Sequence, residues 1–230
     1  MKTQVIPAVI LALSLSGASA DPKREVLDAI KKLGEQASYS WTSTPKTEGS
    51  EAARRQGPVE GKTEQGGLTC FKGTVGEGSY EAAFKGDKSV LKLAGDWITP
   101  EELGEDGERA VRRLKALKRP VEEAGELVNK AAEIKKESDG LYVSDLTADG
   151  AKELFGRLGR RAAEAPEAKG SVKFRVKDGQ LTQYEFSVQG KITVGEEKRE
   201  VNISRTVTVE IKDVGSTKVA LPEAARKKLS

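Results

Sequence analysis

The stretch SVKFRVKDGQLTQYEFSVQGKITV, residues 171–194, decides the fold because it carries the clearest strand pattern in the chain. Apolar and polar residues alternate on both sides of Asp178-Gly179, and this period of two is typical of half-buried strands. An Asp-Gly pair suits a two-residue turn that needs positive φ. The sequence therefore predicts a β-hairpin here. The apolar face of its second arm consists of Tyr184, Phe186, Val188 and Ile192.

The following strand, VNISRTVTVEI at residues 201–211, places one charged residue on its apolar face. Arg205 alternates with Ile203 and Val207 on that face, so its charge must be paired, reach water or face a cavity. If the face lines a pocket, Arg205 would bind a carboxylate or phosphate head group of a ligand. A buried ion pair or a position at the rim of a barrel is the structural alternative.

The order of the remaining segments indicates one α+β domain. A helix is expected after Asp21-Pro22, then a strand around Trp41, and a polar loop over residues 45–56. Short strands separated by glycine-rich turns fill residues 58–95. A capping box at residues 99–102 opens a helical insert of about 100–165, in which residues 108–136 are predicted to be mostly helical and residues 151–165 form one further helix. A terminal helix is expected after Pro222.

The first twenty residues read as a secretory signal peptide. One lysine precedes an apolar run from Val5 to Leu15, and Ala18 and Ala20 occupy the positions expected before a cleavage site. Cleavage after Ala20 would leave residues 21–230 as a single mature domain in the periplasm or outside the cell. Asp21, rather than a cysteine, follows the cleavage site, so we expect no lipid anchor.

Composition excludes several classes of function. The chain has no histidine, which excludes Ser-His-Asp and Cys-His catalysis and histidine-ligated zinc. Cys70 is the only cysteine, so no intramolecular disulfide can form, and we expect no disulfide-linked partner. With 39 Lys and Arg against 36 Asp and Glu, the charge balance does not favour nucleic-acid binding. We therefore expect no catalytic residues, metal or cofactor, and a monomer.

A basic cluster inside the helical insert is a candidate membrane- or partner-facing patch, because it shares its predicted helix with apolar residues. A solvated face with local ion pairs is the alternative reading. The patch consists of Arg109, Arg112, Arg113 and Lys115.

The pattern across most of the mature chain resembles the lipoprotein-carrier half-barrel superfamily, which includes the LolA, LolB and LppX types, and it is similar to exported bacterial proteins without an assigned function. The resemblance is carried by VLDAIKKLGEQASYSWT at 26–42, GQLTQYEFSVQGKITV at 179–194, REVNISRTVTVEIKDVG at 199–215 and KVALPEAA at 218–225. It implies a curved antiparallel sheet, a half-barrel, with helices covering its concave face around a cavity for acyl chains. The chain departs from that pattern in its few aromatic residues and its long helical insert.

Three functions follow in order. The first is a non-enzymatic exported protein that binds a lipid or a lipoprotein acyl chain in the groove of the sheet, with a possible anionic membrane surface as a second partner. The second is a cell-envelope structural or interaction protein with a filled core and no ligand. The third is a hydrolase that uses two carboxylates. The predicted cavity wall consists of Trp41, Trp97, Tyr184, Phe186, Val188, Ile192, Ile203, Arg205 and Val207.

Overall fold

The structure of the 230-residue chain is a computed structural model. It describes residues 21–49, 56–75, 78–92, 95–103, 117–194 and 199–230. The predicted signal peptide at 1–20 and the basic patch at 109–115 lie outside these residues.

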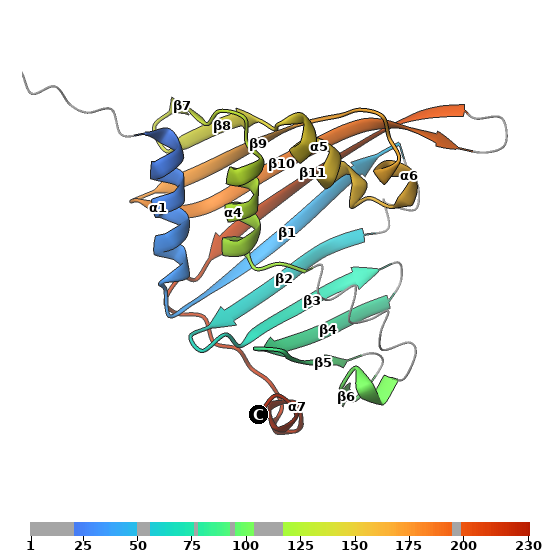
Figure 1. The fold of residues 1–230 in the computed structure, drawn as a ribbon. Coiled ribbons are helices and arrows are strands. Elements are labelled where there is room, and N and C mark those ends of the chain that lie inside the picture. The colour runs from blue at the N-terminus through green and yellow to red at the C-terminus, as the bar shows by residue number, and fades with distance from the viewer. Residues whose placement is uncertain (1–20, 50–55, 76–77, 93–94, 104–116, 195–198) are drawn as a thin grey trace, which may run out of the picture.

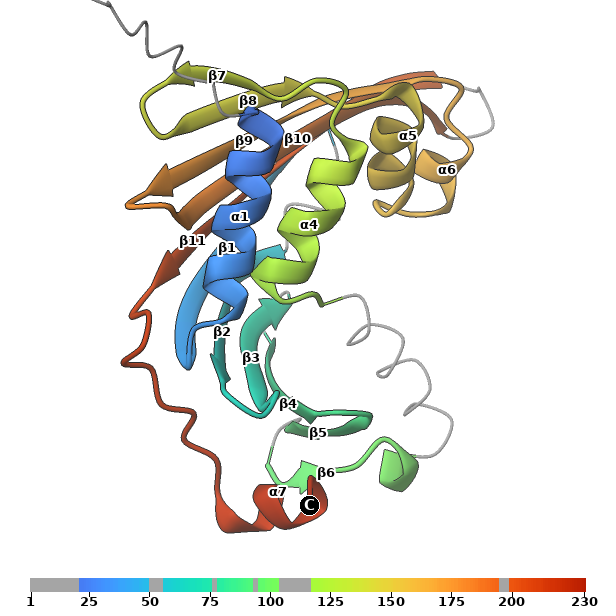
Figure 2. The same ribbon diagram turned by 60° about the vertical axis from the view of Figure 1, so that its left-hand side comes forward.

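Eleven strands form one antiparallel sheet in the order β6-β5-β4-β3-β2-β1-β11-β10-β9-β8-β7 (Figure 1). The strands are β1 (Ser38–Glu48), β2 (Gln56–Glu64), β3 (Thr69–Val75), β4 (Gly78–Lys85), β5 (Lys88–Lys92), β6 (Trp97–Ile98), β7 (Lys135–Ser138), β8 (Leu141–Asp145), β9 (Ala168–Lys177), β10 (Gln180–Val194) and β11 (Arg199–Lys212). The sheet stays open and curves strongly, so it has a concave and a convex face (Figure 2). The predicted α+β fold with a curved antiparallel sheet is confirmed.

The predicted hairpin is the centre of this sheet. It joins β9 to β10 through Asp178 and Gly179, whose φ angles of 53° and 70° are those of the expected tight turn. On the concave face Tyr184 pairs with Val209 of β11, and Val188 pairs with Arg205. The apolar faces of β10 and β11 are therefore continuous.

Four helices lie over one half of the concave face, along strands β8 to β11 and β1 (Figures 1 and 2). They are α1 (Pro22–Gly34), α4 (Pro120–Lys130), α5 (Ala148–Gly156) and α6 (Arg160–Ala163). Each of the first three presents one apolar stripe to the sheet; in α1 this stripe is Val26, Ala29, Ile30 and Leu33. The ring of Phe155 in α5 lies so close to Gly190 that a Cβ there would approach it to 2.8 Å. The helices thus form the main core with this half of the sheet.

The C-terminal helix α7 (Glu223–Lys228) packs on the opposite, convex face at the far end of the sheet. Cys70, Ala83 and Val90 are register neighbours on that face. Ala225 and Leu229 close over them in a second, smaller cluster. A short 3-10 turn, η1 (Glu101–Leu103), follows β6, and the Thr99 backbone N–H donates to Glu102 over 2.7 Å, as its capping box predicts.

Three local predictions are corrected. Pro45 belongs to β1, not to a loop, because β1 pairs with β2 only as far as Ser43 and no neighbour on that side needs the proline N–H. Helix α4 starts at Pro120 as predicted but ends at Lys130, since residues 135–138 pair with β8 as an edge strand. The single helix predicted over residues 151–165 breaks at Gly159, whose φ is 134°.

Among the described helices, none combines the length and the apolar character that crossing a membrane requires.

Candidate ligand-binding face

Six of the nine predicted wall residues belong to the main core. They are Trp41, Tyr184, Phe186, Val188, Ile203 and Val207, and each is at most 8% exposed. The sheet brings them together on its concave face, as predicted. The helices fill the space against them, so these side chains lie in packed core on the described residues.

The other three predicted wall residues differ. Ile192 and Arg205 lie on the same concave face and are partly buried, near the end of the β10–β11 hairpin. Trp97 is a correction: it pairs with Lys92 and packs in the convex cluster under α7. Its position two residues from Thr99 gave no sign of which face it would take, because β6 is only two residues long.

A row of four aromatic rings crosses the concave face from β1 to β4. Tyr39 and Trp41 have ring centroids 5.6 Å apart, Trp41 meets Phe71 edge to face at 5.6 Å, and Phe71 meets Phe84 edge to face at 5.5 Å. Such contacts stabilise by about 0.5–1.5 kcal/mol each beyond area burial. Phe71 and Phe84 were missed as site residues, although the alternation in GLTCFKG and SYEAAFKG places them on strands.

Two glycines make room for large rings on this face. A Cβ on Gly61 would lie 2.1 Å from the Trp41 ring, and one on Gly73 would lie 2.6 Å from the Tyr80 hydroxyl. Trp41 and Tyr80 each pair directly with the glycine that they cover. The rings therefore lie flat along the sheet instead of standing away from it.

Part of the concave face stays open beside the helices. We call it the open strip, and it runs from β11 across β1 and β2 to β4. Its partly exposed residues are Ser43, Pro45, Val59, Tyr80, Phe84 and Arg205. Five of these six are uncharged, and three are large and apolar or aromatic. The strip borders the aromatic row along its whole width.

A polar cluster joins α4 to the sheet next to the strip. The Tyr184 hydroxyl donates to the Glu123 carboxylate over 2.6 Å. Burial raises the pKa of Glu123, and the hydrogen bond from Tyr184 opposes the rise. Burial lowers the pKa of Arg205, while the charge of Glu123 opposes this. A carboxyl and a guanidinium thus influence each other inside the curved sheet.

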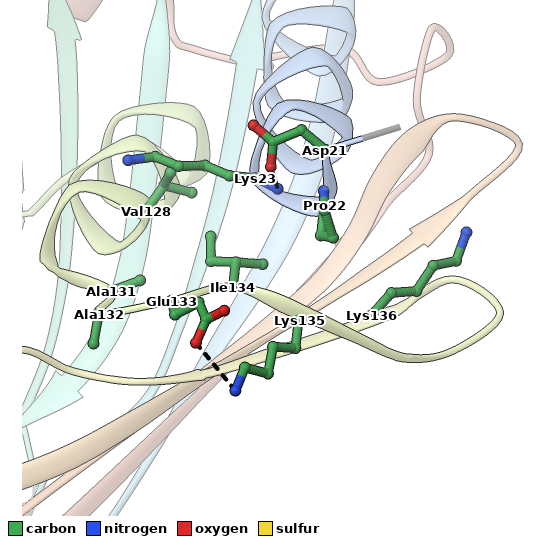
Figure 3. Close-up of a pocket in the computed structure, with 10 residues that line it drawn as sticks. All are labelled: Asp21, Pro22, Lys23, Val128, Ala131, Ala132, Glu133, Ile134, Lys135 and Lys136. Atoms are coloured by element: carbon green, nitrogen blue, oxygen red, sulfur yellow. Dashed lines mark hydrogen bonds and ion pairs between the residues drawn. The ribbon is translucent and has the colours of Figure 1, made fainter. Parts of the chain in front are cut away.

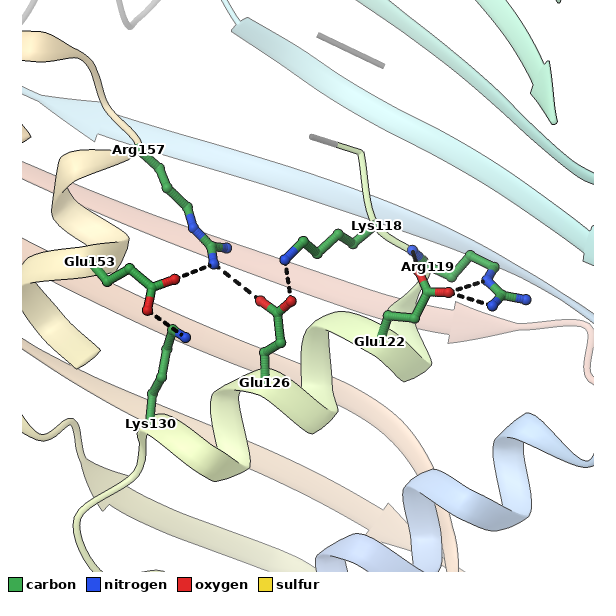
Figure 4. A network of polar contacts seen from close by, with 7 residues as sticks. All are labelled: Lys118, Arg119, Glu122, Glu126, Lys130, Glu153 and Arg157. Carbon is green, nitrogen blue, oxygen red and sulfur yellow. Dashed lines mark hydrogen bonds and ion pairs between the residues drawn. The ribbon is translucent and has the colours of Figure 1, made fainter. Parts of the chain in front are cut away.

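A ladder of ion pairs closes the gap between α4 and α5 (Figure 4). Arg157 bridges Glu126 and Glu153 at 3.1 and 2.9 Å, and Lys130 binds Glu153 at 2.8 Å. Lys118 completes the ladder on Glu126. Hydrogen bonds from Lys130 and Arg157 lower the pKa of Glu153, so it stays ionised. This does not favour the hydrolase reading, which needs one carboxylic acid that stays protonated.

Two surface pockets lie among the described residues, and neither contains a predicted wall residue. The larger, about 540 Å³, lies between the start of α1, the end of α4 and β7, and the Glu133–Lys135 ion pair crosses its rim (Figure 3). The smaller, about 500 Å³, lies between α5 and α6. Within the described part of the chain no three His, Cys, Asp or Glu side chains converge as a metal site would require.

Comparison with solved structures places this geometry among known folds. LprF from Mycobacterium bovis superposes with a TM-score of 0.50 at 12% identity, over 89% of this chain and 97% of that one. The chain has the half-barrel fold of LprF. The fold implied by the resemblance to lipoprotein carriers is therefore confirmed.

Two more distant half-barrels align over similar lengths. The lipoprotein LppX of Mycobacterium tuberculosis gives a TM-score of 0.46 at 12% identity over 86% of this chain and 97% of that one. A LolA-superfamily protein from Nitrosomonas europaea gives 0.32 at 10% identity over 88% and 96%. We base no argument on these two. No family model and no curated protein matches the sequence.

Proposed function

We propose that this protein is a non-enzymatic binder of a hydrophobic or amphipathic ligand, a lipid or an acyl chain, which lies along the open strip of the half-barrel. The observation that carries the proposal is the row of partly exposed apolar and aromatic side chains on the concave face beside the helices. Burying one methylene stabilises by about 0.8 kcal/mol, so an acyl chain along this strip would bind well without any charged contact.

The half-barrel fold supports the same ligand class, since the superfamily that the sequence resembles encloses acyl chains in the concave side of its sheet. Here the helices already fill half of that side. We therefore place the ligand on the β1–β4 half, and not on the β9–β11 half that the sequence predicted.

Native mass spectrometry of protein purified without detergent, with organic extraction of the same sample, tests this. We expect a co-purifying lipid, or uptake of a fluorescent fatty acid by the emptied protein. Val59→Gln should weaken uptake severalfold, because Val59 lies in the strip. Glu60→Gln, the next residue on the convex face of β2, is the matched control and should bind as the wild type does. Protein that is repeatedly empty and takes up no fatty acid would refute the proposal.

We also propose that residues 1–20 direct export and are removed after Ala20, which leaves residues 21–230 as one domain that acts in the periplasm or outside the cell, as a monomer. The amino-terminal sequence of the protein recovered from its native host tests the cleavage site. A mature chain that still begins at Met1 would contradict it.

A second candidate is favoured by one observation, the packed core against six of the predicted wall residues. In that reading the protein is a cell-envelope interaction protein, and the surface outside the core does the work. The basic patch at Arg109, Arg112, Arg113 and Lys115 is then the place for an anionic membrane or an acidic partner. Flotation with vesicles that contain anionic lipid distinguishes the two, since this candidate predicts vesicle binding with no lipid inside the protein.

A further inference from the structure

Thr47 is an unusual residue on the concave face. It is only 6% exposed, and its hydroxyl has no hydrogen-bond partner among the described residues. A buried hydroxyl without a partner costs about 1–3 kcal/mol, so native proteins seldom keep one without a reason. A ligand atom would supply the missing partner.

Arg205 lies directly across from Thr47 on the neighbouring strand. Directly opposed residues of an antiparallel pair point to the same face, with Cβ atoms about 4.5–5.5 Å apart. The Arg205 side chain is partly buried there and already takes part in an interaction. A guanidinium has five donors, so it can bind a further acceptor in addition.

The two residues lie at one end of the open strip. Thr47, Pro45, Ser43 and Trp41 alternate along the concave face of β1, which puts Thr47 roughly 20 Å from Trp41 at about 3.3 Å per residue. The strip between them is uncharged. A polar end group at Thr47 and an apolar chain toward the aromatic row would therefore each meet matching side chains.

We propose that Thr47 and Arg205 bind the anionic head group, a carboxylate or a phosphate, of an acyl-chain ligand whose tail follows the open strip toward Trp41. The inference rests on the ligand binding proposed above and adds the class and the orientation of the ligand. Thr47 donates its hydroxyl hydrogen to a head-group oxygen, and Arg205 adds charge-assisted donors.

Glu123 is the acidic group that acts on Arg205 from the helix side. Its carboxylate already accepts from Tyr184. It faces the guanidinium from α4, whereas Thr47 lies beside it on β1. The head group therefore approaches Arg205 from the β1 side, where no described acid is known to act on it.

The test compares two probes with the same chain, hexadecanoic acid and its methyl ester, by competitive native mass spectrometry. Wild-type protein should prefer the acid by roughly tenfold or more, as charge-assisted hydrogen bonds allow. Thr47→Val should weaken the acid severalfold and leave the ester unchanged. Arg205→Gln should remove the preference for the acid.

Matched controls lie on the convex face of the same sheet. Thr44→Val and Arg175→Gln change exposed residues and should leave both affinities unchanged. A long-chain alkyl phosphate in place of the acid distinguishes the two head groups by their relative affinities.

Thr47→Val also has a second readout that needs no ligand. Because it replaces an unpartnered hydroxyl by a methyl of similar size, the empty variant should unfold at a higher temperature than the wild type. A lower unfolding temperature together with an unchanged preference for the acid would overturn the proposal. Equal binding of acid and ester by the wild type would also overturn it and leave ligand binding intact, whereas binding of neither would remove both proposals.

Discussion

Glycines decide how closely the aromatic rings approach the sheet. Gly61 and Gly73 lie beneath Trp41 and Tyr80, and a side chain on either would enter the ring above it. These positions need glycine for space, since neither has a positive φ. The sequence shows both glycines but not the rings across the strands, because the partner of each is set by a register that only the folded sheet defines.

Gly61→Ala should therefore destabilise the protein by about 1–3 kcal/mol, the usual cost of overpacking a core. Its methyl group would lie 2.1 Å from the Trp41 ring, so the ring must move. Chemical denaturation followed by tryptophan fluorescence measures the change. Gly125→Ala is the matched control with the opposite sign: nothing lies within 4 Å of a Cβ there, and alanine in the interior of α4 should stabilise by about 0.5–1 kcal/mol. Equal effects of the two substitutions would contradict this account.

Glu123 should make stability fall as pH rises. Burial raises its folded-state pKa above the ordinary 4.5, so its contribution is fully present below that value and is lost as pH rises through the folded pKa. Glu123→Gln can still accept from Tyr184 but cannot ionise. We expect this variant to gain unfolding temperature relative to the wild type between about pH 4 and about pH 8.

Glu126→Gln should behave in the opposite way. Burial raises the pKa of Glu126, but hydrogen bonds from Lys118 and Arg157 outweigh it and hold the pKa below 4.5. Its stabilisation is therefore present above that pH and is lost as pH falls. The Gln variant should be less stable than the wild type at neutral pH, and the difference should vanish in acid. Parallel pH profiles for the two variants would contradict the assigned directions.

At the scale of elements, local pattern predicted the strands and capped helices well. The alternation around Asp178-Gly179 and the Asp21-Pro22 start of α1 both reappear in the structure, because a period of two and a side-chain cap are local effects. Pro45 and residues 135–138 were wrong because each depends on a neighbour. Pro45 is tolerated only where β2 no longer pairs, and the strand β7 exists only because β8 lies beside it.

The ion-pair ladder between α4 and α5 gives an element-scale prediction. Arg157→Gln removes the cation shared by Glu126 and Glu153, so stability should fall by about 1 kcal/mol or less at low salt. The side chains are roughly two-fifths to one-half exposed, hence added salt should reduce the difference. Arg160→Gln is the control, since the Arg160–Glu164 pair is almost wholly exposed. Thermal unfolding at two salt concentrations measures both, and a salt-independent loss would refute the electrostatic explanation.

At the scale of the whole molecule, the half-barrel could be predicted from strand order and resemblance, but the filled part of it could not. Tyr184 and Phe186 read as cavity wall because alternation shows only that a face is apolar, not what covers it. Burial against α1, α4 and α5 depends on helices that come from distant parts of the chain. Thr47 carried no signal at all in the sequence, since a lone threonine on a strand is ordinary.

The convex cluster predicts how the C-terminal helix protects Cys70. Burial raises the pKa of this thiol to about 11, so it reacts slowly with alkylating reagents at neutral pH. Ala225 is fully buried under α7, and Ala225→Arg should displace the helix and expose the thiol. Labelling of Cys70 with a maleimide should then become faster severalfold. Ala224→Arg, an exposed position on the same helix, should label as slowly as the wild type; equal rates for both variants would contradict the role of α7.

The two outermost strands have a consequence for how copies of the protein meet. An open sheet has two free edges, and unpaired backbone groups along an edge can recruit a strand from another molecule. Here one edge is β6, with two residues, and the other is β7, with four exposed residues that include Lys135 and Lys136. Edges so short, one of them carrying two lysines, give a second copy little to pair with. The same curvature that leaves this half-barrel open can therefore persist at high concentration without growth into strand-linked assemblies.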